Sequence, residues 1–572
     1  MHLFRNSPLA LLLGMILLGS ASVGAQSNDA PLNTDFGETI NIKVISVPVY
    51  VTDKKGNPIR GLEKEDFILL EDGKPVNLTN FYEVSDGRRL GEEGEPVEAP
   101  DPLRASEPEL IQRRPQVPDD QMLHVIVYVD HFNIRPFNRN RVFRFVREFL
   151  RKHVDRDDRV MLASYNRSVK VERPFTSDAQ VISRALFELE KHTGGRTNYD
   201  SERRDLLRDM MDTQYPSQVE SRVRLQAESI FNDMQFTLDG LKDMVTSLSG
   251  LPGRKALLYV SDGLPQRAGD DLFQAAAERF PDQFGSMRLD ALQFDSTRRL
   301  SDIANTAAAN NVAFYTMDAT GLLGRSSLGA EYQANFTSVN IDSIAAQNMQ
   351  SSIQFLADET GGQFIVNTNN FDDGFDRFGS DFANYYSLGF SPGHAGSGRR
   401  YDLKCRLKEK RKGVVCRTKR SYRDKSVETE MGDVTLASLR YGYERNPLGV
   451  KLVKRDEIAS DNDQFTIHVD AQIPLDNIVL IPRAAGEVYE ASIRVWVQAQ
   501  DSKGGLSDVT AQRVPIEIPR ADIEAIKGKY WAYTMPMRVR AGDQKIAVTV
   551  RDDLAGKSSV VSRVMSAGSS GP

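Results

Sequence analysis

The sequence predicts an α/β protein in which a doubly wound, Rossmann-like parallel sheet is flanked by β-rich segments. Two nearly continuous apolar runs, His124–Val129 and Arg254–Ser261, each end at an aspartate, Asp130 and Asp262 respectively. Continuous apolar strands of this kind are typical of a parallel sheet that is buried on both faces. Helical patterns alternate with these strands, and the alternation predicts helices on both sides of the sheet.

The expected α/β domain covers residues 121–425. Apolar residues at helical spacing predict a helix over Arg141–His153 with one apolar face. Further strands are expected at Arg159–Tyr165 and Val312–Met317. Residues 200–249 are long, charged and helical in pattern, and we expect them to be a helical insertion. The arginines of this insertion are compatible with an acidic partner surface, although a solvated helix face is the simpler interpretation.

The first residues have the pattern of a secretory signal over residues 1–25. A weakly basic start is followed by an apolar core over Leu9–Leu18, and Val23-Gly24-Ala25 fits a cleavage site for signal peptidase. The apolar core is too short for a comfortable membrane span. We therefore expect a secreted protein, periplasmic or extracellular, with no transmembrane segment in the mature chain; an uncleaved N-terminal anchor is the alternative.

Two regions precede the α/β domain. Residues 38–84 contain alternating apolar positions separated by turns, including Asp72-Gly73, and predict a small β module. Residues 85–120 are rich in Pro, Glu, Arg and Gly and contain few apolar residues. Such a composition cannot bury enough surface to order itself, so a flexible linker is expected there.

The C-terminal region, residues 430–566, is β-rich and predicts a β-sandwich. It contains four aromatic residues of interest: Trp496, Tyr530, Trp531 and Tyr533. Exposed aromatic side chains on a β-sandwich can bind carbohydrate, whereas core packing is the simpler role for Trp496.

The chain contains two cysteines, Cys405 and Cys416, separated by a charged turn. Folding the segment back at Lys410-Arg411 places the two cysteines opposite each other. In a secreted chain this pattern predicts one disulfide that clamps a β-hairpin, with two unpaired thiols as the alternative.

Composition and motifs narrow the class of function. The net charge of −6 is small for 572 residues, so the chain lacks the basic excess of a nucleic-acid-binding protein. The sequence has no Gly-x-Ser-x-Gly, His-Glu-x-x-His or phosphate-binding loop motif. His131 beside Asp130 is a poor catalytic dyad, because adjacent residues on an extended segment point to opposite sides. We therefore expect a non-catalytic protein.

The two aspartate-terminated strands and the turn Gly194-Gly195-Arg196-Thr197-Asn198 together resemble a von Willebrand factor A (vWA) domain. The segments around Asp66-Phe67 and Tyr386–Phe390 also resemble parts of the VWFA-related proteins of Acidobacteria. The resemblance covers about residues 40–425 and rests mainly on the order of the motifs. It implies a vWA fold with a ligand site at the carboxyl edge of the parallel sheet.

In the vWA family this edge holds a divalent cation through an Asp-x-Ser-x-Ser motif, a threonine and a second aspartate. The resemblance places the corresponding oxygen ligands at Asp130, Thr197 and Asp262, with Mg²⁺ or Mn²⁺ as the metal. The two serine positions are Phe132 and Ile134, which supply no side-chain oxygen. The site is therefore degenerate, and helix capping or loop hydrogen bonding is the competing role for both aspartates.

Two classes of function follow for a protein outside the cytoplasm. The first is adhesion or protein binding through the carboxyl edge of the α/β sheet. The second is a carbohydrate- or cell-envelope-binding accessory protein that uses its C-terminal β domain. Replacing Asp130 and Asp262 would impair partner binding in the first case, and replacing Trp531 and Tyr533 would impair it in the second.

Overall fold

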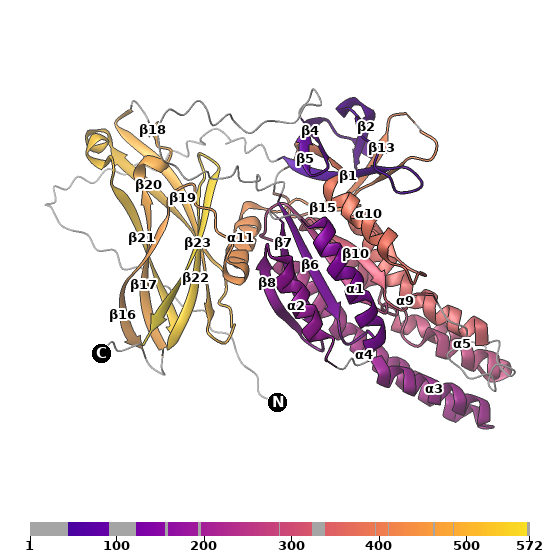
Figure 1. The fold of residues 1–572 in the computed structure, drawn as a ribbon. Coiled ribbons are helices and arrows are strands. Elements are labelled where there is room, and N and C mark those ends of the chain that lie inside the picture. Colours follow the sequence, from indigo (N-terminus) through magenta and orange to yellow (C-terminus); the bar gives the residue numbers. More distant parts are fainter. Residues whose placement is uncertain are drawn as a thin grey trace, which may run out of the picture. The chain divides into compact units, whose positions relative to one another are not determined.

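The computed structural model describes most of the chain beyond residue 43 (Figure 1). The described ranges are 44–90, 122–154, 158–192, 196–284, 287–322, 338–394, 396–409, 411–460, 464–483 and 486–568. The expected signal at 1–25 and most of the expected linker at 85–120 lie outside them. Residues 85–90 are an exception, because β5 (Arg88–Leu90) pairs with β4 (Leu78–Ser85). Strand structure therefore continues into the expected linker, through a turn in which Asp86 and Gly87 both have positive φ.

A six-stranded, mainly parallel sheet confirms the expected α/β core. Its spatial order is β11-β10-β9-β6-β7-β8. In chain order the strands are β6 (Leu123–Asp130), β7 (Arg159–Tyr165), β8 (Val169–Thr176), β9 (Arg254–Ser261), β10 (Val312–Asp318) and β11 (Phe364–Ile365). Only β8, at one edge, runs antiparallel to its neighbour. The chain moves outward from β6 to β8 and then returns to the other side of β6 with β9, so the strand order reverses between β6 and β9.

Helices cover both faces of this sheet. On one face, α1 (Pro136–His153), α2 (Ala179–Leu189) and α10 (Asp372–Ala383) pack onto Val125, Val127 and the other residues of the first core. On the opposite face, α4 (Pro216–Ser247), α8 (Thr297–Ala309) and α9 (Ser338–Thr360) cover Ile126 and Tyr128. Alternate residues of β6 thus enter different cores, which explains why the whole strand is apolar.

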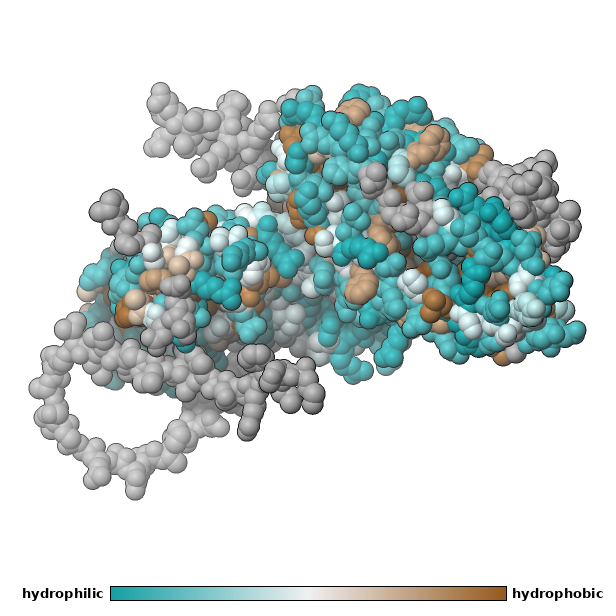
Figure 2. All heavy atoms as spheres, turned by 90° about the horizontal axis from the view of Figure 1, so that it is seen from below, coloured by the Kyte–Doolittle hydropathy of each residue, from teal (hydrophilic) through white to brown (hydrophobic). Residues whose placement is uncertain are grey.

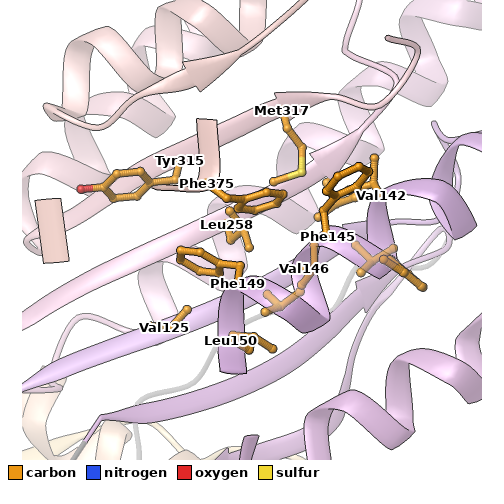
Figure 3. Close-up of a cluster of buried hydrophobic side chains, with 14 of the residues drawn as sticks. Val125, Val142, Phe145, Val146, Phe149, Leu150, Leu258, Tyr315, Met317 and Phe375 are labelled. Atoms are coloured by element: carbon orange, nitrogen blue, oxygen red, sulfur yellow. The ribbon is translucent and has the colours of Figure 1, made fainter. Parts of the chain in front are cut away.

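Local sequence determines where α1 lies and how it packs. Pro136 stands at the first helical turn, where its missing N–H costs nothing, and basic residues occupy the last turn. Figure 3 shows the apolar face of α1 against the strands, with Phe149 beside Phe375 of α10. Their ring centroids are 5.1 Å apart. The helix begins five residues before the expected start at Arg141, because Pro136 initiates it.

The helical insertion forms its own small core. The helices α3 (Arg196–Asp212) and α5 (Asp270–Arg279) pack with the first half of α4 through Leu207, Val223, Phe273 and neighbouring apolar residues. Two short helices, α6 (Pro281–Phe284) and α7 (Met287–Asp290), connect α5 towards α8. This arrangement extends α4 beyond the sheet edge at which Asp130 and Asp262 lie.

The N-terminal strands pair with strands that follow the α/β core. One sheet has the order β14-β1-β12-β4-β5 and the other β15-β13-β2-β3. They combine β1 (Ile45–Thr52), β2 (Phe67–Glu71), β3 (Lys74–Pro75), β4 and β5 with β12 (Tyr385–Phe390), β13 (Arg400–Leu407), β14 (Val415–Arg417) and β15 (Ser421–Arg423). Both sheets share one apolar core. The module expected at 38–84 therefore completes its sheets with strands from residues 385–423.

The C-terminal region contains two further antiparallel sheets around a common core. One consists of β16 (Lys451–Ser460), β17 (Gln464–Pro474) and β21 (Tyr530–Arg540). The other contains β18 (Ile481–Arg483), β19 (Val488–Asp501), β22 (Gly542–Asp552) and β23 (Lys557–Ala567), and β20 (Thr510–Pro519) also pairs with β19. Before these strands, α11 (Val427–Tyr441) packs against β22 and β19.

Candidate functional site

Three aspartates lie at the carboxyl ends of three neighbouring strands. Asp130 is the last residue of β6, Asp262 follows the last residue of β9, and Asp318 is the last residue of β10. Val129 pairs with Val260, and Asp318 pairs with Ser261. Because the strand order reverses between β6 and β9, this edge is the topological switch point, where open α/β sheets usually bind ligands.

Asp130 is fully buried and holds the loop that follows β6. Its carboxylate accepts hydrogen bonds from the backbone N–H of Asn133 at 3.0 Å and from Asn133 Nδ2 at 2.9 Å. The Tyr259 hydroxyl also donates to it, at 2.5 Å. Burial, followed by the charge of Asp130, raises the pKa of Tyr259 well above its usual value, so this hydroxyl keeps its proton. Asp130 therefore acts as an anchor for the loop amide.

Asp262 lies at the N-terminus of α1, and its side chain is fully buried. Asn138 Nδ2 donates to both carboxylate oxygens at 3.0 Å, and the backbone N–H of Arg135 donates to Oδ2 at 3.1 Å. Arg135 is the residue that precedes the first turn of α1. Asp262 therefore supplies the acceptor and the negative charge that a helix N-terminus favours.

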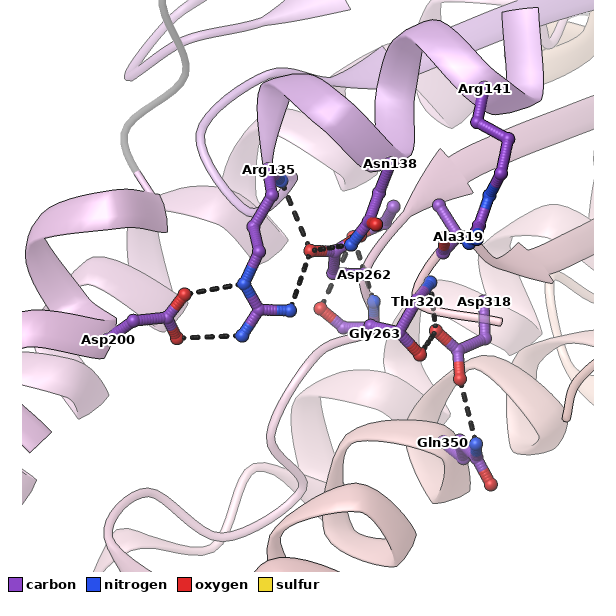
Figure 4. A network of polar contacts seen from close by, with 11 residues as sticks. Arg135, Asn138, Arg141, Asp200, Asp262, Gly263, Asp318, Ala319, Thr320 and Gln350 are labelled. Carbon is purple, nitrogen blue, oxygen red and sulfur yellow. Dashed lines mark hydrogen bonds and ion pairs between the residues drawn. The ribbon is translucent and has the colours of Figure 1, made fainter. Parts of the chain in front are cut away.

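The Arg135 side chain connects Asp262 to the helical insertion (Figure 4). Its Nη1 lies 3.2 Å from Asp262, while Nε and Nη2 donate to Asp200 of α3 at 2.6 and 2.9 Å. Burial opposes the charge of Arg135, but the hydrogen bonds to Asp200 and the charge of Asp262 outweigh it and raise the pKa of Arg135. A permanently charged guanidinium therefore bridges two carboxylates at the switch point.

The side chains at this edge of the sheet are better suited to pairing with the Arg135 guanidinium than to binding a divalent metal ion. Mg²⁺ requires about six oxygen ligands in near-octahedral geometry. Ile134 is fully buried in the core under α1, and the ring of Phe132 packs edge-on against Tyr165. The backbone of Thr197 lies in α3, but its side chain is outside the described residues. Among the residues that are described, no group of three or more His, Cys, Asp or Glu side chains could hold a metal ion.

Asn133 brings the two sequence-predicted aspartates together. It donates to Asp130, and its backbone carbonyl accepts a hydrogen bond from the N–H of Asp262 at 3.2 Å. Arg135, Asn138 and Asp200 could not be selected from the sequence, because none of them belongs to the family motif. Their partnership depends on how α1 and α3 approach the edge of the sheet.

Asp318 holds a separate loop at the same edge. Its Oδ1 accepts hydrogen bonds from the backbone N–H of Thr320 at 2.9 Å and from the Thr320 hydroxyl, and its Oδ2 accepts one from Gln350 of α9 at 2.7 Å. Sequence analysis missed this residue, although it ends a predicted strand in the same manner as Asp130. The repeated aspartate after each strand was the signal that could have identified it.

His131 is held by a buried arginine on the core side of the edge. Arg139 Nη1 lies 3.1 Å from His131 Nδ1, and the same guanidinium donates to the carbonyl oxygens of Glu190 and His192 at 2.7 Å. Burial first, and then the charge of Arg139, lower the pKa of His131 to about 4. The imidazole is therefore neutral at physiological pH, and its contact with Arg139 has a structural role.

A cavity of about 350 Å³ opens beside this network. Its lining combines the loops that follow β6 and β7 with one face of α3 and α4: Phe132, Asn133, Asn166, Arg167, Tyr199, Glu202, Gln226, Ser229, Ile230, Asp233, Met234 and Pro265. The lining is mixed in polarity and charge. The volume lies in the range of small-ligand and side-chain pockets, so the edge can receive a protruding group.

The arginines of the insertion are paired within the protein. Arg203 is buried and contacts Asp271 at 2.6 Å and Asp342 at 3.1 Å. Arg222 pairs with Asp209, and Arg224 pairs with Asp290. These three arginines therefore have carboxylate partners within the protein, whereas Arg204 contacts the carbonyl oxygen of Asp200 and the hydroxyl of Ser201. The insertion is therefore held together by its arginines.

The aromatic residues of the C-terminal region pack mainly inward. Trp496 is 1% exposed, and Trp531 and Tyr533 contact the core with their rings stacked at 6.0 Å. Tyr530, at the start of β21, is 47% exposed. The carbohydrate-binding alternative thus depends on one open ring and the edges of two partly buried ones.

The two cysteines face each other without a disulfide bond. Their sulfur atoms are 3.0 Å apart and both are free thiols. Cys405 lies in β13, which pairs with β2, whereas Cys416 lies in β14, which pairs with β1. The two cysteines are opposite each other as expected, but their strands do not form one hairpin: a bond here would join two sheets, because each cysteine strand pairs with a different N-terminal strand.

Comparisons with known proteins give little further information. No family model and no curated protein matches the chain. An aerotolerance-related membrane protein from Bacteroides fragilis is similar to 46% of this chain over 98% of its own, at 11% identity and a TM-score of 0.23. BatB from Bacteroides thetaiotaomicron matches 46% of this chain over 96% of its own, at 9% identity and a TM-score of 0.21. The PilB minor pilin from Streptococcus sanguinis matches 47% over 61%, at 10% identity and a TM-score of 0.21. TM-scores this low support no conclusion about function.

In the part of the chain that the structure describes, no helix combines the length and the hydropathy that crossing a bilayer requires.

Proposed function

We propose that the protein is a secreted, non-catalytic vWA-like protein that binds another protein at the carboxyl edge of its α/β sheet. The observation that carries this proposal is the cavity at the topological switch point, bounded by the loops after β6 and β7 and by α3 and α4. Ligands of open α/β sheets bind at such a point.

The bound group would be recognised without a metal ion. Arg135 pairs with both Asp262 and Asp200 from within the protein, so the loop after β6 and α3 are already joined beside the cavity before a partner arrives. Preorganised surfaces of this kind spend less free energy on ordering when they bind. On the face drawn in Figure 2, hydrophobic residues form small separate groups among hydrophilic ones. Shape and hydrogen bonding at the cavity would therefore determine the choice of partner.

The test fills the cavity with one side chain. Ser229 of α4 lines the cavity, whereas Ser221 is exposed on the same helix and does not belong to the lining. Partners are captured by crosslinking in a cell-envelope extract, using the wild-type protein, Ser229→Trp and the matched control Ser221→Trp. We expect a partner that is retained by wild type and by the control and lost with Ser229→Trp.

The alternative function is tested in the same experiment. Capture that survives Ser229→Trp but disappears with Tyr530→Ala and Trp531→Ala would favour a carbohydrate- or cell-envelope-binding role for the C-terminal β domain. It would also refute binding at the α/β edge.

A further inference from the structure

Three lysines converge at the opposite edge of the sheet, where β9 begins. Lys255 of β9 donates to the carbonyl oxygen of Asn310 at 2.9 Å. Lys419 donates to Asn311 Oδ1 at 2.5 Å, and Lys425 donates to Asn310 Oδ1 at 2.5 Å. All three ammonium groups therefore meet at the C-terminal end of α8, although they come from distant parts of the sequence.

Two of these lysines are almost fully buried. Lys255 is 3% exposed and Lys419 is 6% exposed. Their hydrogen bonds go to carbonyl and amide oxygens, which carry only partial negative charge. The carboxylate of Asp433 pairs with Lys425 at 2.6 Å. The cavity that these lysines line also contains Arg423, Arg445 and Glu430, so its five basic and two acidic side chains leave a formal charge of about +3 when all of them are ionised.

The surroundings oppose this accumulation of positive charge. Burial, followed by the charges of Lys425 and Lys419, lowers the pKa of Lys255 to about 7. Burial and Lys425 together lower the pKa of Lys419 to about 8. Keeping uncompensated cations inside a protein costs several kcal/mol per ion unless a counter-charge is present. The cluster is therefore short of negative charge.

A cavity of about 390 Å³ adjoins the cluster. Basic side chains dominate the charged part of its lining: Lys255, Lys419, Arg423, Lys425 and Arg445, against Glu430 and Asp433. In the wall of the cavity, the backbone of Gly250 lies directly against the backbone of Asp433. A Cβ atom on Gly250 would lie only 2.0 Å from the carbonyl oxygen of Asp433, so only glycine fits there. The middle of α11 therefore lies close against the loop before β9, and the cavity has space for a ligand larger than a single ion.

We propose that the cluster of Lys255, Lys419 and Lys425 is a binding site for a dianionic phosphate group, carried by inorganic phosphate or by a phosphorylated ligand. A dianion offsets most of the local positive charge, and an ammonium group is a suitable point-charge partner for phosphate oxygens. This site lies at the other end of the strands from the candidate protein-binding edge and is independent of the function proposed there.

The test is isothermal titration of sodium phosphate into the full-length protein at pH 7.0, where phosphate is a mixture of its monoanion and dianion, Lys255 is about half charged and Lys419 carries most of its charge. We expect saturable binding that weakens about tenfold or more in Lys255→Met and in Lys419→Met, because each variant removes a charged donor. Lys242→Met is the matched control: Lys242 lies on α4, is 44% exposed and pairs with Asp302. Binding should be unchanged there.

The melting temperature, measured with and without phosphate, shows whether each variant is folded and provides a second test of binding. Replacing a buried, uncompensated ammonium group with methionine is expected to preserve folding, so the melting temperature without phosphate should be retained. Phosphate should raise it for wild type and Lys242→Met only. Absence of saturable binding to wild type, or equal binding to Lys255→Met, would overturn the site. Acetate that binds as tightly as phosphate would overturn its assignment to a dianion. The same titration is repeated with glycerol phosphate. Tighter binding of glycerol phosphate than of inorganic phosphate would show that the site takes the phosphate group of a larger ligand.

Discussion

Replacing Asp262 with alanine tests whether this carboxylate organises the carboxyl edge of the sheet. The change removes the acceptor of two donors, the backbone N–H of Arg135 and the Nδ2 of Asn138, and Asn138 is buried. Leaving a buried donor without a partner costs about 1–3 kcal/mol. The Arg135 guanidinium is 40% exposed and keeps Asp200, so its loss adds less than about 1 kcal/mol. Taking about 1 kcal/mol for each of the two donors and slightly less than 1 kcal/mol for the ion pair gives about 3 kcal/mol.

Hydrogen exchange followed by mass spectrometry measures this change locally, which matters because a chain with several cores need not unfold in one step. A cost of about 3 kcal/mol corresponds to exchange about 100-fold faster in residues 131–135 and 262–265. Asp200→Ala is the matched control, because it removes the other carboxylate of Arg135 and leaves Asp262 in place. We expect an acceleration of about tenfold or less in that variant.

Two results would refute the reasoning. Exchange in Asp262→Ala that stays within about threefold of wild type would show that the donors find other partners. An equal effect of Asp200→Ala and Asp262→Ala would show that the guanidinium bridge, rather than the α1 N-terminus, carries the stabilisation.

Three further predictions follow from the same structure. Wild-type protein should give no saturable heat with Mg²⁺ or Mn²⁺, since the Arg135 guanidinium already pairs with Asp262. Saturable heat that disappears in Asp262→Ala would restore the metal site. Oxidation should convert Cys405 and Cys416, which are 11 residues apart, to a disulfide. Two titratable thiols should then be lost, and the folded protein should be stabilised by about 3 kcal/mol. Two thiols that remain after oxidation would contradict this prediction. His131 has a pKa of about 4 when folded, below its usual 6.5, so the unfolded chain binds its proton first. Its contribution is complete above pH 6.5 and is lost towards pH 4. His131→Asn should therefore flatten the decrease in melting temperature over that range, and an unchanged slope would argue against a neutral imidazole.

The parallel core of the fold could be predicted because its signal is local. Strands β6 and β9 are continuous apolar runs that end in a polar residue, and their observed bounds agree closely with the expected ones. The pairing of β1 with β12 could not be predicted in this way. Val47 pairs with Leu388, more than three hundred residues later, and the period of a strand does not encode its neighbour.

The candidate site was predictable only in part. Asp130 and Asp262 could be placed at one edge, because parallel strands end on the same side of a sheet. The role of Arg135 could not be inferred, since it depends on the position of Asp200 after α3 has folded back over the edge. A sequence motif indicates which side chains bind the ligand in a family. That an internal arginine pairs with these side chains in place of a metal ion can be recognised only from the contacts in the folded protein.

The insertion of the α/β core between paired strands has a mechanical consequence. The chain enters through β1 and leaves through β12, and these two strands form an antiparallel ladder in which Ile45 lies opposite Phe390. Tension applied between Ile45 and Phe390 therefore loads this ladder at one end, and it must open the ladder one hydrogen bond after another before it can reach β6. Until then the helices and strands between residues 123 and 383 lie outside the path of the force.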